Sequence, residues 1–230
     1  MKYSSSIPVP SCRFTFRHYD EILKSAKDSG YEFISMEGFA SGKRADNFLI
    51  IRHDMDFSPI RAVEFAKIEN KYGAKATYFI RVHSDKYNPF GFETYKIIKE
   101  IIELGHDIGL HYEHLDFVDI TGEDPSTVLL REKKLLETIF DITIKGLAPH
   151  RDFTPTINRD FWKDKDIRDF GFSFEAYMDV FLEDIYYTSD SLGKWGGDGK
   201  CLCQFIGVKK RIYALIHPLY WYQSNYHIHP

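Results

Sequence analysis

FLIIRHDMD, residues 48–56, joins an apolar run to a polar cluster, and Ser58-Pro59 follows it. An apolar run bounded by turn signals predicts a strand that is buried on both faces. Asp54 and Asp56 are two residues apart, so an extended chain places them on the same side, about 7 Å from each other. Burying both carboxylates without a partner would be very costly, which predicts a cation beside them. Two interpretations remain open at this point: a metal site with acid/base chemistry, or a cluster of polar residues that forms a turn and caps the following helix.

Composition describes an ordinary globular chain. The 230 residues are 43% hydrophobic and 28% charged, enough for one large α/β domain or two small ones. A net charge of −4 argues against a nucleic-acid partner, which would require a basic face. No apolar run is long enough to span a membrane. Residues 1–10 lack the charged start and apolar centre of a secretory signal, so we expect a cytoplasmic protein.

Strand and helix patterns alternate along most of the chain, which predicts a mainly parallel sheet, open or closed into a barrel. The expected strands are 31–36, 48–51, 76–80, 106–111, 145–148, 172–177, 186–189 and 211–216. The expected helices are 18–29, one that starts at Ser58 and ends before Gly73, 95–104, 126–140 and 161–170, with a loop at 37–47. We expect one domain over residues 1–230, with a loose segment at 1–13 and an aromatic tail at 218–230.

Reactive side chains follow the ends of five different expected strands. They are His53 to Asp56, His111 with His114, His150 with Arg151, Asp190, and His217. In parallel α/β barrels the active site lies at the carboxyl ends of the strands, and several strands supply its catalytic groups. This repeated placement predicts an enzyme.

Histidine spacing suggests a metal site. His111 and His114 are three residues apart, so a helical turn would bring them together, and Asp56 would complete a two-histidine, one-carboxylate set. Such a set suits a divalent ion, and zinc with three protein ligands keeps an open position for water. We expect His18, His83 and His106 to be ordinary core or surface residues.

The three cysteines, Cys12, Cys201 and Cys203, are too few and too widely spaced to predict a disulfide framework or a structural zinc site. We interpret the short Cys201-Leu202-Cys203 stretch as one face of a strand.

Five motifs occur in a characteristic order along the chain: RHDMDFS (52–58), GHDIGLHYEH (105–114), APHR (148–151), SDSLGKW (189–195) and LIHPLYW (215–221). From about Tyr19 to Trp221 the chain resembles the polysaccharide deacetylases of carbohydrate esterase family 4. It is most similar to the branch linked to surface-polysaccharide (O-antigen or capsule) biosynthesis. The resemblance implies a distorted (β/α)7-type barrel and metal-dependent hydrolysis of an N-acetyl group on a sugar.

The resemblance also implies roles for individual residues. Asp54 matches the catalytic base, His217 the general acid, and Arg151 and Asp190 the residues that orient them. The family's second aspartate, a metal ligand, falls at Met55, so Asp56 is the nearest substitute. The metal histidines would be His111 and His114, although their spacing is one residue shorter than usual. The implied cofactor is a divalent metal, zinc first, with manganese, cobalt or nickel as alternatives.

The expected substrate is an N-acylated carbohydrate or sugar nucleotide. We expect His53, His150, Trp195 and Trp221 to contact it, with core packing as the alternative for the tail aromatics. Two other functions stay open: hydrolysis of a non-sugar C–N bond by the same barrel, and a non-catalytic carbohydrate-binding or assembly protein. A homo-oligomer is also left open.

Overall fold

The predicted buried strand is β2 (Phe48–Met55), and all eight of its residues are buried. The structure is a computed structural model that describes residues 12–150, 158–196 and 199–223. Its other strands are β1 (Glu32–Phe33), β3 (Thr77–Ile80), β4 (Asp107–Tyr112), β5 (Gly146–Pro149), β6 (Phe174–Glu175), β7 (Tyr186–Ser189) and β8 (Arg211–Ile216). Every pairing between these strands is parallel.

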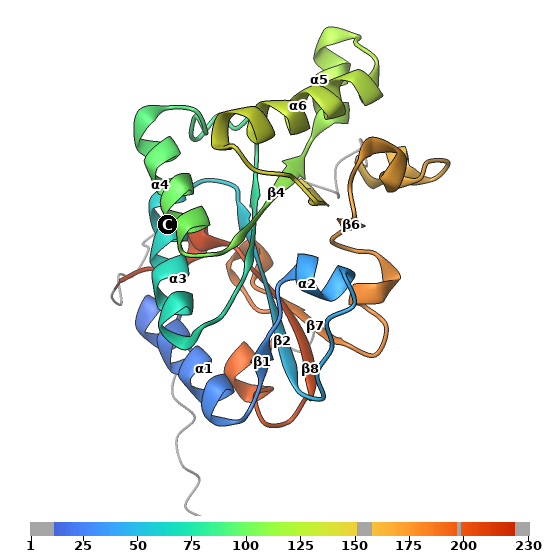
Figure 1. The fold of residues 1–230 in the computed structure, drawn as a ribbon. Helices are drawn as coiled ribbons and strands as arrows, with labels where there is room; N and C mark the ends of the chain where they lie inside the picture. The colour runs from blue at the N-terminus through green and yellow to red at the C-terminus, as the bar shows by residue number, and fades with distance from the viewer. Residues whose placement is uncertain (1–11, 151–157, 197–198, 224–230) are drawn as a thin grey trace, which may run out of the picture.

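The strands follow the order β6-β5-β4-β3-β2-β8-β7, and β1 pairs with the first residues of β2 beside this path. The path curls into a half-barrel of parallel strands (Figure 1). Across its interior the Tyr213 hydroxyl on β8 donates to the carbonyl of Ala176 just after β6 (3.1 Å), which links the two halves of the curl. The predicted α/β fold, a distorted (β/α)7-type barrel, is therefore confirmed.

The helices are α1 (Phe16–Asp28), α2 (Met36–Ala40), α3 (Pro59–Tyr72), α4 (Phe92–Glu103), α5 (His114–Thr121) and α6 (Pro125–Phe140). Helices α1, α3, α4 and α6 pack on the outer face of the sheet, with α3 between α1 and α4 (Figure 1), whereas the short helix α2 packs against the core inside the half-barrel. Helix α3 has proline at its first position and ends at Gly73, whose positive φ of 68° suits glycine. No helix in the described part of the chain is long and apolar enough to cross a membrane.

Alternation along β2 sorts its side chains into two cores. Leu49, Ile51 and Met55 belong to the core between the sheet and the helices, whereas Phe48 and Ile50 belong to the core inside the half-barrel. Arg52 and Asp54 continue the inner series because side chains two residues apart on a strand share a face. The buried strand thus aims its first aspartate into the barrel.

The inner core is filled by aromatic rings that need glycine on neighbouring strands. A Cβ atom on Gly146 of β5 would lie 2.1 Å from the Phe174 ring, and one on Gly109 of β4 would lie 2.4 Å from the Phe79 ring. Both glycines therefore let a phenylalanine fill the space below the strand ends.

Three sequence expectations need correction. The segment expected to be a loop contains α2, because the Ser35 side chain accepts a hydrogen bond from the Gly38 amide and caps a short helix. The expected helix at 161–170 is two 3₁₀ turns, Asn158–Trp162 and Ile167–Phe170. The Asp166 side chain accepts from the Arg168 amide, and such local bonds compete with a continuous helix. The strand expected at 172–177 shortens to β6.

Candidate functional site

The carboxyl ends of β2, β4, β5 and β8 meet at one pocket. A cavity of about 340 Å³ is lined there by Asp54, Asp56, Phe57, His111, Pro149, His150, Tyr177, Ser191, Leu192, Leu215, His217 and Tyr220. This volume lies at the small end of the range for ligand pockets. Its histidines and carboxylates lie at the ends of strands β5, β4, β2 and β8, which lie in that order in the sheet with β3 between β4 and β2, as expected at the carboxyl edge of a parallel barrel.

Asp54 is held by an arginine from its own strand. The Arg52 guanidinium makes two 2.7 Å hydrogen bonds to the two carboxylate oxygens, and both side chains are almost fully buried. Burial alone would raise the pKa of Asp54, but the Arg52 charge, with help from His111, holds it well below its usual range. Asp54 is therefore ionised and fixed in orientation.

Asp56 occupies the centre of the cluster. Its Oδ1 lies 3.1 Å from Nε2 of His111 and 3.7 Å from Nε2 of His150. Its Oδ2 lies 4.0 Å from Nε2 of His217. Burial raises the pKa of Asp56, but its contacts with His111 and His217 lower it further than burial raises it, so this carboxylate is also ionised. One carboxylate thus faces three histidine nitrogens.

The histidines beside Asp56 are oriented through their second ring nitrogens. Nδ1 of His111 donates to the carbonyl of Ala148 (2.9 Å), and Nδ1 of His150 donates to Glu113 (2.8 Å). Glu113 is itself held by Arg81 through two bonds of 3.0 and 2.8 Å. Burial lowers the pKa of His150, which favours the neutral ring. Burial lowers the pKa of His111, but Asp54 and Asp56 raise it further than burial lowers it, and its Nε2 faces Asp56. Both rings thus direct Nε2 into the pocket, the orientation typical of histidines that bind a metal, and an ion would take the place of the Nε2 proton of His111.

His217 forms a separate acid group on the β8 side. Its Nδ1 donates to Asp190 (2.7 Å), and the other oxygen of Asp190 accepts from Nε1 of the buried Trp221 (2.7 Å). Burial alone would lower the pKa of His217, but Asp190 raises it to about 9. His217 is therefore protonated near neutral pH, with its Nε2–H facing the pocket.

Two predicted site histidines lie outside the pocket. His53 follows the outer face of β2, is fully buried, and contacts Glu69 on α3 (2.6 Å), so it cannot touch a substrate. His114 begins α5, where the turn carries its ring against Phe161 (centroids 4.6 Å apart). Neither ring nitrogen of His114 has a hydrogen-bond partner among the described residues. We expected His150 to bind substrate. It instead lies beside Asp56 and His111, in the place expected for the second metal histidine.

The predicted tryptophans are also buried away from the cavity. Trp221 is fully buried and Trp195 is 8% exposed, and the two rings pack against each other and against Phe14. Instead, the aromatic residues that line the pocket are Phe57, Tyr177 and Tyr220. Arg151, the predicted orienting arginine, lies outside the described residues.

Sequence reasoning missed three supporting residues. Arg52 could have been found from its spacing, because it lies two residues before Asp54 on the same face of a strand. Glu113 lies within the motif GHDIGLHYEH (105–114), but nothing in the sequence shows that it contacts His150, which follows the next strand, β5. Arg81 follows β3, and its pairing with Glu113 depends on the order of strands in the sheet.

The fold is similar to that of a known deacetylase. PplD of Streptococcus pyogenes, solved in complex with acetate, matches with a TM-score of 0.51 and 16% sequence identity, over 88% of this chain and 83% of that chain. IcaB from Ammonifex degensii matches with a TM-score of 0.48 and 16% identity, over 68% and 73% of the two chains. Neither a family model nor a curated protein matches the sequence. At this identity the likeness to PplD shows a shared fold.

Proposed function

We propose that the protein is a metal-dependent hydrolase that removes an N-acetyl or other acyl group from an amino sugar or sugar nucleotide. The observation that carries this proposal is the meeting of Asp54, Asp56, His111, His150 and His217 at one pocket. Two further points support it: the fold is similar to that of a deacetylase solved with acetate, and the five sequence motifs resemble a deacetylase family. That resemblance extends the proposal to a role in surface-polysaccharide biosynthesis.

The donor set fits a divalent ion. Asp56, His111 and His150 would hold it, with His150 in place of His114, and two imidazoles with one carboxylate suit zinc, with manganese, cobalt or nickel as alternatives. When bound, the ion would polarise the amide carbonyl and lower the pKa of the attacking water. Glu113 and Arg81 would keep His150 in place.

Proton transfer falls to two groups beside Asp56. Asp54, ionised and fixed by Arg52, would accept the proton of the attacking water. His217, protonated through its bond to Asp190, would donate a proton to the leaving amine. An amide needs this proton because a free amine anion is a very poor leaving group.

The shape of the pocket favours a sugar-sized group. Its volume of about 340 Å³ suits one ring, and Tyr177 and Tyr220 at its wall offer aromatic faces that can pack against sugar C–H bonds. Ser191 adds a hydroxyl that can bond to the substrate. These residues replace Trp195 and Trp221 as the proposed sugar contacts.

Acetate release from N-acetylated amino-sugar oligomers and nucleotide-linked N-acetyl sugars, measured with and without added zinc, tests the proposal. In the Asp54→Asn variant we expect turnover to be lost while metal remains bound, because Asp54 is assigned to proton transfer. Asp28→Asn changes an exposed carboxylate at the end of α1 and serves as the matched control, with activity unchanged.

Circular dichroism would confirm that Asp54→Asn is folded. Loss of metal in this variant would exchange the roles of Asp54 and Asp56. Hydrolysis of cyclic amides in place of acetylated sugars would move the function to a non-sugar C–N bond. Absence of any turnover with every substrate and metal would contradict the proposal.

A further inference from the structure

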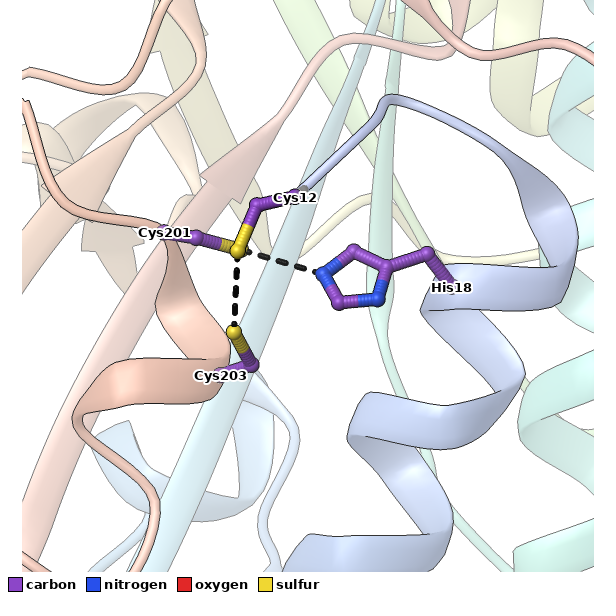
Figure 2. Close-up of side chains that lie close together, drawn as sticks. All are labelled: Cys12, His18, Cys201 and Cys203. Atoms are coloured by element: carbon purple, nitrogen blue, oxygen red, sulfur yellow. Dashed lines mark hydrogen bonds between the residues drawn. The ribbon is translucent and has the colours of Figure 1, made fainter. Parts of the chain in front are cut away.

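A second group of possible metal ligands lies apart from the pocket. Cys12 precedes α1, and His18 lies in the first turn of α1. Cys201 directly precedes the 3₁₀ turn Leu202–Gln204 before β8, and Cys203 lies within that turn. One ligand atom from each residue lies within 4.8 Å of all the others (Figure 2). Wide spacing along the sequence therefore does not keep these cysteines apart, because folding brings Cys12 to Cys203 across 191 positions.

We propose that Cys12, His18, Cys201 and Cys203 form a structural zinc site. Nε2 of His18 lies 3.3 Å from the Cys201 sulfur, and the sulfurs of Cys12 and Cys203 are 3.3 Å apart. Zinc bound tetrahedrally at about 2.3 Å from sulfur and about 2.0 Å from nitrogen requires ligand separations of roughly 3.5–3.8 Å. Small movements of the side chains would close the four ligands around one ion.

The chemistry of the set favours zinc over hard cations. Three thiols and one imidazole form a closed Cys3His set, which is typical of structural zinc and leaves no open position for a substrate. Hard cations such as magnesium or calcium prefer oxygen ligands, and this set has none. The cysteine stretch is also not the plain strand face that we expected, since it forms a turn that directs both sulfurs to the same point.

His18 carries the secondary contact that metal-binding histidines usually have. Its Nδ1 lies 3.5 Å from Glu21 one turn along α1, and Glu21 is also paired with Arg17 (3.1 Å). This contact leaves Nε2 directed at the sulfurs. A carboxylate on the outer nitrogen fixes the ring and strengthens the inner nitrogen as a ligand.

The site would connect distant parts of the chain behind the pocket. Cys12 leads within two residues to Phe14, which packs on Trp195 and Trp221 (centroids 5.7 and 5.2 Å). Trp221 in turn donates to Asp190, the partner of His217. An ion here would therefore hold Cys12 and α1 close to Trp221 and Asp190, the residues that position the proposed general acid His217. The two metal sites share no residue, so this proposal stands independently of the proposed function.

Cobalt substitution tests the site with a signal specific for thiolates. Purified under reducing conditions and loaded with cobalt(II), the full chain should show thiolate-to-cobalt charge transfer in the near ultraviolet and the intense visible bands of tetrahedral cobalt. Added zinc should abolish both. The signal should vanish in Cys203→Ser and persist in His111→Ala, which changes only the pocket.

Wild-type measurements keep the proposal testable if Cys203→Ser does not fold. With zinc bound, the three thiols should react with a thiol reagent much more slowly than after chelation. Absence of the charge-transfer signal in the folded wild-type chain would overturn the proposal. So would thiols that react equally fast with and without zinc, or a mass showing that two cysteines have formed a disulfide under reducing conditions.

Discussion

Glu69 on α3 lies at the centre of a buried polar network on the outer face of β2. Its side chain is fully buried and accepts hydrogen bonds of 2.6 Å from Tyr19, Tyr78 and His53. Burial by itself would raise the pKa of Glu69, but His53, His106 and Tyr19 lower it from 4.5 to about 2. That difference corresponds to about 3 kcal/mol of stability.

We therefore predict that Glu69→Gln lowers the free energy of unfolding by about 3 kcal/mol at pH 7. The folded-state pKa lies below the unfolded value, so the contribution is complete above pH 4.5 and is lost as the pH falls toward 2. The stability gap between wild type and variant should be constant from pH 7 to 5 and should narrow from pH 5 to 3.

Urea unfolding of the metal-free proteins, followed by circular dichroism at several pH values, measures this gap. Glu64→Gln, at a half-buried position of the same helix, should change stability by less than about 0.5 kcal/mol. A gap below about 1 kcal/mol at pH 7, or one that does not change between pH 5 and 3, would refute the reasoning. Metal binding in the pocket should be unaffected by Glu69→Gln, because the network lies on the outer face of β2.

Two further predictions concern the proposed general acid. Because Asp190 raises the pKa of His217 to about 9, kcat/KM should stay high through neutral pH and fall on the alkaline side, as His217 loses its proton. A pH–rate profile with its alkaline limb near pH 6.5, the ordinary value for histidine, would contradict this assignment. Asp190→Asn should move that limb to lower pH and reduce kcat, since His217 loses its anionic partner; an unchanged limb would show that Asp190 does not tune the histidine.

The sequence predicted the parallel fold well because its signal is local. The apolar run before Asp54, the proline and glycine that bound α3, and the strand at 211–216 each depend on neighbouring residues. The same holds for the placement of reactive residues after strand ends. The prediction of short elements was wrong, because α2 and the 3₁₀ turns depend on single side-chain contacts such as those of Ser35 and Asp166.

The composition of the site was harder to predict because it depends on pairing between distant segments. Spacing along the chain predicts His114 as the partner of His111, but the turn into α5 carries His114 into the core, and the adjacent strand β5 brings His150 to the pocket. His53 was grouped with its neighbours although strand alternation sends it to the opposite face. The Cys/His cluster was missed for the same reason, because only the closed fold brings Cys12 to Cys201.

The central claim is that Asp56, His111 and His150 bind one metal ion, and metal content per chain tests it most directly. We would incubate four tag-free proteins with zinc, remove unbound ions and measure the bound metal by mass spectrometry. The proteins are wild type, His111→Ala, His150→Ala and His114→Leu. We predict that His111→Ala and His150→Ala each hold one ion per chain fewer than wild type, whereas His114→Leu holds the same number. Full metal content in His150→Ala, or loss of the ion in His114→Leu, would contradict the claim.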